Sequence, residues 1–294
     1  MLDYHLHLWP HAQADAEATV EQVTAYCERA VAAGVTEIAL TEHLFRFTQA
    51  KDLLGGFWDD LPGDALRPGM AAYWDHHARV DLDTYVEVVL AVKAQGLPVV
   101  LGLEVNYYQD RMDEVAGLLA GYPFDVLLGS VHWLGTWRFD VLGDPLVMAE
   151  WDVRDIDAVW DEYARAMEEL GASGVCDVFA HPDLAKVAGR VPAVPDEYYD
   201  RITEAAVRSG MAAEVSSAGW KKPVGEEYPA PALLKRLVDR GVPLTTASDA
   251  HALPDVADRT SDLRDLLTAA GVTSLQGYRG RQAYAVDVAP PPGA

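Results

Sequence analysis

Histidines with the spacing of metal ligands dominate the chemistry that this sequence offers. Six of the nine histidines stand at or just past the C-terminal end of a predicted β-strand: His5, His7, His43, His132, His181 and His251. Two carboxylates share this position, Glu104 on the third predicted strand and Asp249 after the seventh. Imidazole and carboxylate are ligands of zinc, iron and manganese. Without a metal they would form a cluster of buried, unpaired polar groups, which is unfavourable. The pattern therefore predicts a metal centre.

The number of donors predicts more than one ion. His5 and His7 are two residues apart, so a strand points both side chains to the same face. The eight donors exceed the four ligands of one tetrahedral ion. We therefore expect two or three divalent ions (zinc, iron or manganese), with Glu104 on the central strand as a bridging ligand.

Short apolar runs that alternate with helical patterns indicate the elements that position these donors. Gly34, Gly96, Gly171, Gly210 and Gly241 each follow a helical pattern, as expected of glycines that close helices in the left-handed conformation. Helices are expected at Ala18–Ala33, Leu82–Ala94, Asp155–Leu170, Pro195–Ser209 and Ala230–Arg240. Strands are expected at Leu2–Leu8, Glu37–Thr41, Pro98–Leu103, Val126–Val131, Val175–Ala180, Ala212–Val215 and Pro243–Ala247.

Repeated strand–helix units predict a parallel sheet in an α/β protein. Seven strands fit one closed or nearly closed TIM-like barrel, in which side chains from separate strands meet at the C-terminal rim. An open doubly wound sheet is the alternative. The absence of Gly-x-Gly-x-x-Gly after the first strand argues against a dinucleotide-binding version of it.

One domain is expected over residues 1–289, with a disordered tail at 290–294. Residues 44–80 are the least regular stretch and are interpreted as a long insertion on one strand–helix loop, of the kind that forms lids or substrate walls. His76 and His77 lie in this insertion and are interpreted as surface or lid residues, with contact to substrate as the alternative.

Composition limits the partners and the compartment. With 23 basic and 46 acidic residues the net charge is −23, which argues against nucleic-acid and membrane-surface binding. An anionic substrate would need local positive charge, for which Lys221, Lys222 and Arg46 are the candidates. Two isolated cysteines, no signal peptide and no membrane span favour a cytoplasmic protein whose cysteines are buried and reduced.

Taken together, the strand-end motifs resemble those of one known family. They are His5-x-His7, Glu42-His43, Glu104, Gly129-Ser130-Val131-His132, His181-Pro182-Asp183 and Ser248-Asp249-Ala250-His251. This ordered set resembles the polymerase and histidinol phosphatase (PHP) superfamily over residues 3–255. The runs 122–125, 217–222 and 227–231 look like its histidinol-phosphatase branch. Members of that branch often carry Cys-Gly-His-Ala where this chain reads Leu8-Trp9-Pro10-His11-Ala12.

The resemblance implies a distorted seven-stranded β/α barrel with a trinuclear metal centre. Its pattern places one ion on His5, His7, Glu104 and Asp249, a second on Glu104, His132 and His181, and a third on His11, His43 and His251. The implied reaction is hydrolysis of a small phosphate monoester, most simply L-histidinol phosphate, by attack of a metal-bound hydroxide. Asp249, His251 and Asp183 are the expected catalytic side chains, and the expected partner is a small-molecule phosphate ester.

Three other readings stay open at this stage. An amidohydrolase barrel also opens with His-x-His, but it usually needs a carboxylated lysine on a central strand, where this chain has Glu104. A phosphodiesterase or nuclease of the same superfamily would be expected to carry a basic groove. A non-enzymatic metal-binding domain is disfavoured because the main ligands are all present.

Overall fold

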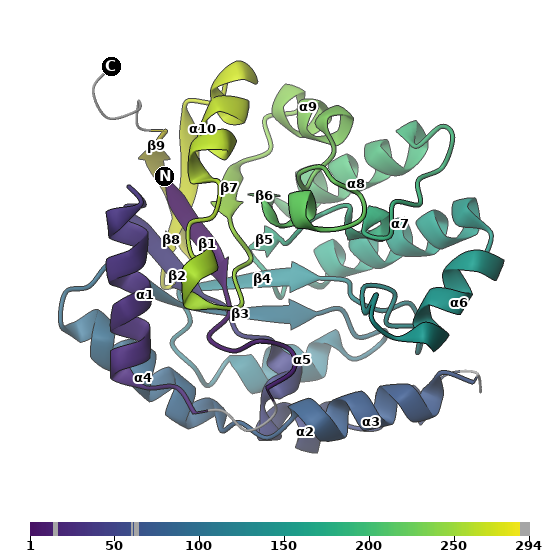
Figure 1. The fold of residues 1–294 in the computed structure, drawn as a ribbon, viewed down its shortest axis with the longest axis horizontal. Helices are drawn as coiled ribbons and strands as arrows, with labels where there is room; N and C mark the ends of the chain where they lie inside the picture. The colour runs from purple at the N-terminus through teal and green to yellow at the C-terminus, as the bar shows by residue number, and fades with distance from the viewer. Residues whose placement is uncertain (14–16, 60, 62–64, 289–294) are drawn as a thin grey trace.

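Seven parallel strands form one sheet whose order follows the sequence, and the sheet curls until its edges nearly meet (Figure 1). The computed structural model of the chain describes residues 1–13, 17–59, 61 and 65–288. Between the two edges, the His7 N–H donates to the carbonyl of Ala250 over 2.8 Å. The Thr246 hydroxyl donates to the carbonyl of Leu2 over 2.7 Å. The predicted seven-stranded β/α barrel is therefore confirmed.

The strands of the barrel are buried along their whole length. They are β1 (Leu2–Leu6), β2 (Glu37–Leu40), β3 (Val99–Asn106), β4 (Val126–Ser130), β5 (Val178–Phe179), β6 (Ala212–Ser216) and β7 (Leu244–Ala247). Their apolar runs are typical of parallel strands that are covered on both faces. Strand β1 is shorter than predicted, and its register with β2 shifts between Asp3 and Leu6. Strand β5 is also shorter, and the carboxylate of Asp177 just before it accepts the Leu127 N–H over 2.8 Å.

Helices surround the barrel, and several of them begin at a capping side chain. They are α1 (Val20–Ala32), α2 (Thr48–Leu54), α3 (Arg67–His77), α4 (Leu82–Ala94), α5 (Met112–Leu119), α6 (Pro145–Val153), α7 (Ile156–Ser173), α8 (Asp196–Ser209), α9 (Pro231–Asp239) and α10 (Thr260–Ala269). The side chains of Thr19, Asp81 and Asp155 each accept a backbone N–H of the helix that follows. The five helices that the sequence predicts are all present.

The end of α7 corrects one prediction. Gly171 does not close this helix, which continues to Ser173 and ends at Gly174 with φ of 67°. Gly171 is needed for close packing instead, because a Cβ there would lie 3.0 Å from the Phe179 ring. Gly34, Gly96, Gly210 and Gly241 have positive φ, as predicted.

The insertion at 44–80 is more regular than predicted. It contains α2, α3 and the short 3-10 helices Leu44–Arg46 and Phe57–Asp59. Helix α3 ends at His77, whose ring is buried 4.3 Å from that of Tyr73, whereas His76 is exposed. The rings of Phe57, Trp58 and Trp74 pack within 5.9 Å of one another, which connects the second 3-10 helix to α3.

A β-hairpin that the sequence analysis did not predict covers the N-terminal end of the barrel. Its strands β8 (Ser274–Arg279) and β9 (Gln282–Asp287) pair antiparallel. The Arg281 N–H donates to the carbonyl of Asp125, just before β4, over 2.9 Å. The Tyr278 hydroxyl donates to the carbonyl of Asp177 over 3.1 Å. The hairpin thus packs at the end of the barrel opposite the strand ends that carry the predicted donors. The predicted tail at 290–294 lies outside the described residues.

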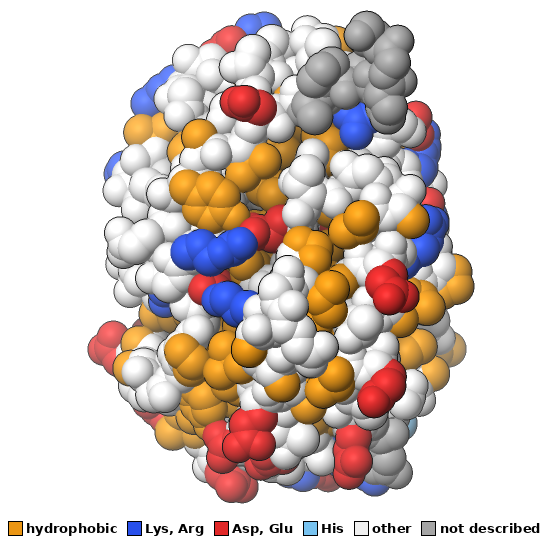
Figure 2. All heavy atoms as spheres, turned by 90° about the vertical axis from the view of Figure 1, so that its left-hand side faces the viewer, with side chains coloured by type: hydrophobic (Ala, Val, Ile, Leu, Met, Phe, Trp, Pro, Cys, Tyr) orange, Lys and Arg blue, Asp and Glu red, His pale blue; other side chains and the backbone are white. Residues whose placement is uncertain are grey.

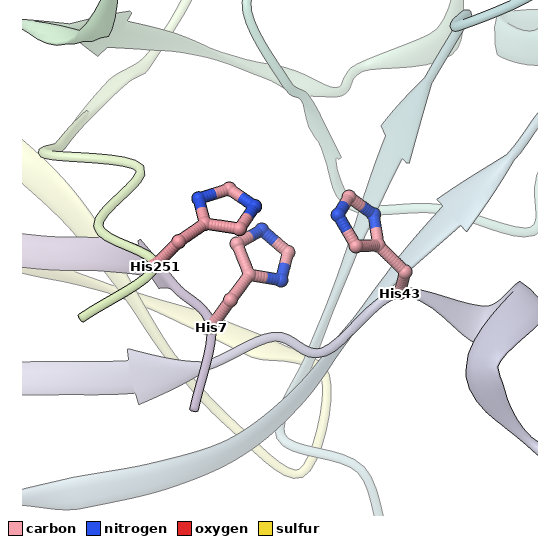
Figure 3. Close-up of side chains that lie close together, drawn as sticks. All are labelled: His7, His43 and His251. Carbon is pink, nitrogen blue, oxygen red and sulfur yellow. The ribbon is translucent and has the colours of Figure 1, made fainter. Parts of the chain in front are cut away.

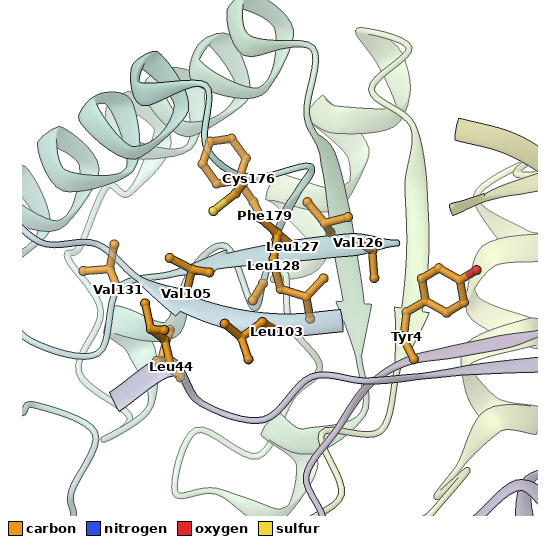
Figure 4. Packing of buried hydrophobic residues seen from close by; sticks show 14 of the residues in the cluster. Tyr4, Leu44, Leu103, Val105, Val126, Leu127, Leu128, Val131, Cys176 and Phe179 are labelled. Carbon is orange, nitrogen blue, oxygen red and sulfur yellow. The ribbon is translucent and has the colours of Figure 1, made fainter. Parts of the chain in front are cut away.

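Apolar side chains of neighbouring strands interlock inside the fold, as the packing around Leu103, Val105 and Leu128 shows (Figure 4). Cys27 and Cys176 are free and buried, as predicted. On the face in Figure 2, basic side chains stand singly or in pairs among hydrophobic and acidic ones. In the described part of the chain, no helix combines the length and the apolar character that crossing a membrane requires.

Candidate metal centre

The donors predicted at the strand ends converge at the C-terminal mouth of the barrel. The ring centroids of His5 and His7 are 5.0 Å apart, and those of His132 and His181 are 5.1 Å apart. The ring of His7 stacks 4.1 Å from that of His43 and 4.2 Å from that of His251, so three separate loops meet there (Figure 3). Residues far apart in the sequence thus form one cluster.

Glu104 lies at the centre of this cluster and is fully buried. Its Oε1 is 3.1 Å from Nε2 of His181 and 3.2 Å from Nε2 of His132. Its Oε2 is 3.3 Å from Nε2 of His5 and 2.5 Å from Nδ1 of His43. One carboxylate therefore faces imidazoles on both of its oxygens, which is the arrangement expected of a bridging ligand.

The donor atoms form overlapping triads in which all atoms lie within 4.8 Å of one another. These triads are His5–His7–Asp249, His5–Glu104–His181, His43–Glu104–His132 and His7–His43–His251. The overlap of the triads fits several neighbouring ions better than one isolated ion.

His11 lies beside the cluster rather than inside a triad. Its ring is 4.3 Å from that of His251 and 5.2 Å from that of His43. In the triad that contains His43 and His251, the third donor is His7. This differs from the third ligand set implied by the resemblance, in which His11 has that place.

The unsatisfied polar atoms of the cluster fit bound metal. Buried atoms without a hydrogen-bond partner include Nε2 of His5, both ring nitrogens of His7 and of His43, Oε2 of Glu104 and Nε2 of His251. Buried polar atoms are normally paired, so this concentration calls for ligands that the protein itself does not supply. His181 and Asp249 also hold positive φ angles of 25° and 53°, backbone strain of the kind found at functional sites.

The charges within the cluster complement one another. Burial opposes the charge of Glu104, but the imidazoles of His132 and His5 hold its pKa well below the usual range. Burial lowers the pKa of His251 to about 3, assisted by His7. His43 shifts in the same direction, again mainly through burial. Both imidazoles are therefore neutral at pH 7, the form that binds a metal.

Further buried side chains, which the sequence analysis did not assign to the site, contact the candidate ligands. Glu214 on β6 lies 2.8 Å from Nδ1 of His5 and accepts the backbone N–H of His181 over 3.2 Å. The amide of Asn106 lies 2.7 Å from Nδ1 of His132. Such outer contacts fix the ring orientation of metal-binding histidines. The signal that the sequence offered was a polar residue within an otherwise apolar strand, at the last position of β3 for Asn106 and in the middle of β6 for Glu214.

We expect Glu214→Gln to weaken metal binding by about 10- to 100-fold, the range typical for loss of an outer-shell partner. The substitution keeps the volume but removes the negative charge that faces His5. Competition against a chromophoric chelator measures the affinity. Glu37→Gln is the matched control, because Glu37 is also buried but interacts with Tyr4 and Arg279 at the other end of the barrel. Equal metal affinity in Glu214→Gln and the unmodified chain would contradict the orienting role.

The predicted cationic residues differ in their availability. Lys221 pairs with Asp255 at 2.8 Å and Asp258 at 3.1 Å. Lys222 is exposed, and neither a hydrogen bond nor an ion pair engages its ammonium group within the described ranges. Its positive charge acts to lower the pKa of the nearby Asp140, which burial raises. Lys222 is thus the more available of the two for an anionic ligand.

Arg46, the third predicted cationic residue, and Asp183, a predicted catalytic residue, both make contacts inside the protein. Arg46 is fully buried, and its guanidinium donates to the backbone carbonyls of Trp9, Pro10 and Gln13 over 3.0–3.2 Å. Its contacts thus hold the segment that carries His11. The Asp183 carboxylate pairs with Lys186 at 3.0 Å and accepts the Ala230 N–H over 2.7 Å, and it belongs to none of the triads.

Comparison with known proteins agrees with this geometry. Residues 3–218 match the PHP domain family, and the chain belongs to that family. A curated relative, a probable histidinol-phosphatase of Deinococcus radiodurans, is 32% identical over 221 residues, which are 71% of this chain and 80% of the relative.

Two solved structures share the fold. The putative histidinol phosphatase of Listeria monocytogenes has a TM-score of 0.70 at 18% identity, covering 89% of this chain and 99% of its own. The histidinol phosphate phosphatase of Lactococcus lactis subsp. lactis, complexed with zinc, L-histidinol and phosphate, has a TM-score of 0.67 at 20% identity. That match covers 96% of this chain and 98% of the Lactococcus chain.

Proposed function

We propose that this chain is a metal-dependent phosphomonoesterase that hydrolyses L-histidinol phosphate to L-histidinol and phosphate. The observation that carries the proposal is the convergence of six histidines and two carboxylates in overlapping triads at one mouth of a PHP barrel. The curated relative in Deinococcus radiodurans supports the choice of substrate by its name. The Lactococcus lactis structure, which contains zinc, L-histidinol and phosphate, supports it by its ligands.

Some residues of the cluster are buried and suited to holding ions, whereas others are partly exposed and suited to contacting a substrate. When bound, two or three ions of zinc, iron or manganese supply a nucleophile at neutral pH and neutralise the charge of the phosphoryl oxygens. His5, Glu104 and His181 are fully or almost fully buried, so they would hold the ions and fix their positions. The side chains of Asp249 and His251 are 16% and 23% exposed. These two residues are therefore placed to contact a substrate or to transfer a proton.

A panel of substrates tests this proposal. Metal-replete protein is offered L-histidinol phosphate, other small phosphate monoesters, cyclic nucleotides, phosphodiesters and amides, with release of product measured for each. We expect L-histidinol phosphate to have the highest kcat/KM by a wide margin. Preferential cleavage of a diester or an amide would contradict the proposal and would indicate a phosphodiesterase or an amidohydrolase instead.

Lys222 is proposed to attract the phosphate group, so Lys222→Ala should lower kcat/KM. We expect a decrease of several-fold, about what one solvent-exposed charge contributes. The decrease should shrink at high ionic strength because salt screens exposed charges. Lys221→Ala is the matched control, since Lys221 is already paired with two aspartates. Equal effects of the two substitutions would remove Lys222 from the proposed site.

A further inference from the structure

The hydroxyl group of Tyr228 is buried and has no hydrogen-bond partner among the residues that the structure describes. The whole residue is only 1% exposed. A phenol that is buried so completely normally finds a partner for its O–H, because the water that it loses must be replaced. The absence of a partner for this hydroxyl therefore indicates that it binds a ligand.

Tyr228 stands where the ends of several strands meet. Its ring lies edge-on to that of His181, with 6.2 Å between centroids. Its backbone is fixed at the end of β6, since the Ser216 N–H donates to the Tyr228 carbonyl over 2.6 Å and the Tyr228 N–H donates to the Ser216 carbonyl over 3.0 Å. The Nζ atom of Lys186 lies 5.2 Å from the ring centroid. The ring is thus held firmly beside one of the metal donors.

The hydroxyl is suited to donate a hydrogen bond. Burial raises its pKa, and the nearby carboxylates of Asp183, Asp249 and Asp140 raise it further, with Tyr163 acting in the same direction. Asp183 follows β5, Asp249 follows β7 and Asp140 follows β4. Tyr163 lies on α7. The phenol consequently stays protonated and neutral. A neutral donor suits a site where a further negative charge would repel an anionic substrate.

We propose that the Tyr228 hydroxyl donates a hydrogen bond to a phosphoryl oxygen of the bound phosphate ester. This inference rests on the proposed function, because the phosphoryl group has to lie against the metal donors, of which His181 is one. Tyr228 then acts as a binding and positioning residue. The proton stays on the phenol oxygen throughout, so no group transfer is assigned to it.

Tyr228→Phe tests the inference because it removes the hydroxyl and keeps the ring. Calorimetry on metal-replete protein gives the dissociation constant of inorganic phosphate, which we expect to rise by about ten- to a hundredfold. The metal content should stay the same. The Tm should stay the same or rise, because the substitution removes an unpartnered buried polar group.

Tyr85→Phe is the matched control. The Tyr85 hydroxyl is also buried, but it donates to the carbonyls of Leu40 at 2.8 Å and Gly102 at 3.1 Å. Its removal should lower the Tm and leave the dissociation constant of phosphate unchanged. The two substitutions thus have opposite expected effects on stability and on binding.

Several results would overturn the inference. These are an unchanged dissociation constant of phosphate in Tyr228→Phe, a loss of metal, or a fall in Tm as large as that of Tyr85→Phe. Absence of phosphate binding to the unmodified holoprotein would also overturn it. The proposed function fails separately: if phosphate binding depends on Tyr228 but L-histidinol phosphate is not hydrolysed, the inference stands and the substrate assignment falls.

Discussion

Glu104→Gln is expected to lower the hydrolysis of L-histidinol phosphate by about a thousandfold or more. Two of the four triads contain Glu104, and its two oxygens face four imidazoles at 2.5–3.3 Å. The amide of glutamine fills the same space as the carboxylate but removes the negative charge that the four imidazoles face. We expect the purified variant to hold at least one fewer equivalent of metal, as measured by elemental analysis.

Two further variants delimit this prediction. Glu104→Asp keeps the charge but withdraws it from the histidines, so its activity should fall between that of Glu104→Gln and that of the unmodified chain. Glu37→Gln removes a buried carboxylate at the opposite end of the barrel and should leave the metal content unchanged. A Glu104→Gln variant with full metal content and near-normal activity would refute the bridging role.

His132→Ala is the second substitution with a large expected effect. Nε2 of His132 lies 3.2 Å from Oε1 of Glu104 and 3.3 Å from Nε2 of His181. Alanine leaves Glu104 with one imidazole fewer, so we expect loss of activity and of at least one equivalent of metal. The Tm in the presence of metal should fall as well, since bound ions stabilise only the folded state.

The control for His132→Ala is His76→Ala, which removes an exposed histidine from the last turn of α3. We expect this variant to keep its metal and its activity. Unchanged metal content in His132→Ala would refute the assignment of this residue as a ligand.

The positions of the candidate metal donors were predictable because they depend on chain topology alone. A histidine or carboxylate that follows an apolar run comes to the C-terminal rim whenever the strands are parallel. His43, His132 and His181 could be assigned to one mouth for this reason. The pairing of donors into triads was less predictable, because it depends on ring orientation. That orientation is set by contacts such as Glu214 with His5, across 209 residues of sequence.

Other features lacked a sequence signal. The turn of the β8–β9 hairpin uses Gly280 and Arg281 at φ of 51° and 65°, without the Asn-Gly or Asp-Gly pair that usually predicts such a turn. The sequence also did not indicate which basic side chains are free to bind an anion. Lys221 is engaged by Asp255 and Asp258, and Arg46 by backbone carbonyls more than 30 positions away. Only the three-dimensional structure distinguishes these two residues from Lys222.

We propose that the cluster of imidazoles and carboxylates binds several metal ions on which hydrolysis depends. The most direct test of this proposal is a titration of chelator-treated protein with zinc, manganese or iron, in which bound metal and phosphate release from L-histidinol phosphate are measured together. We predict negligible release from the metal-free chain and activity that rises to a plateau only after more than one equivalent is bound. Full activity without metal, or failure of all three ions to bind, would contradict the account.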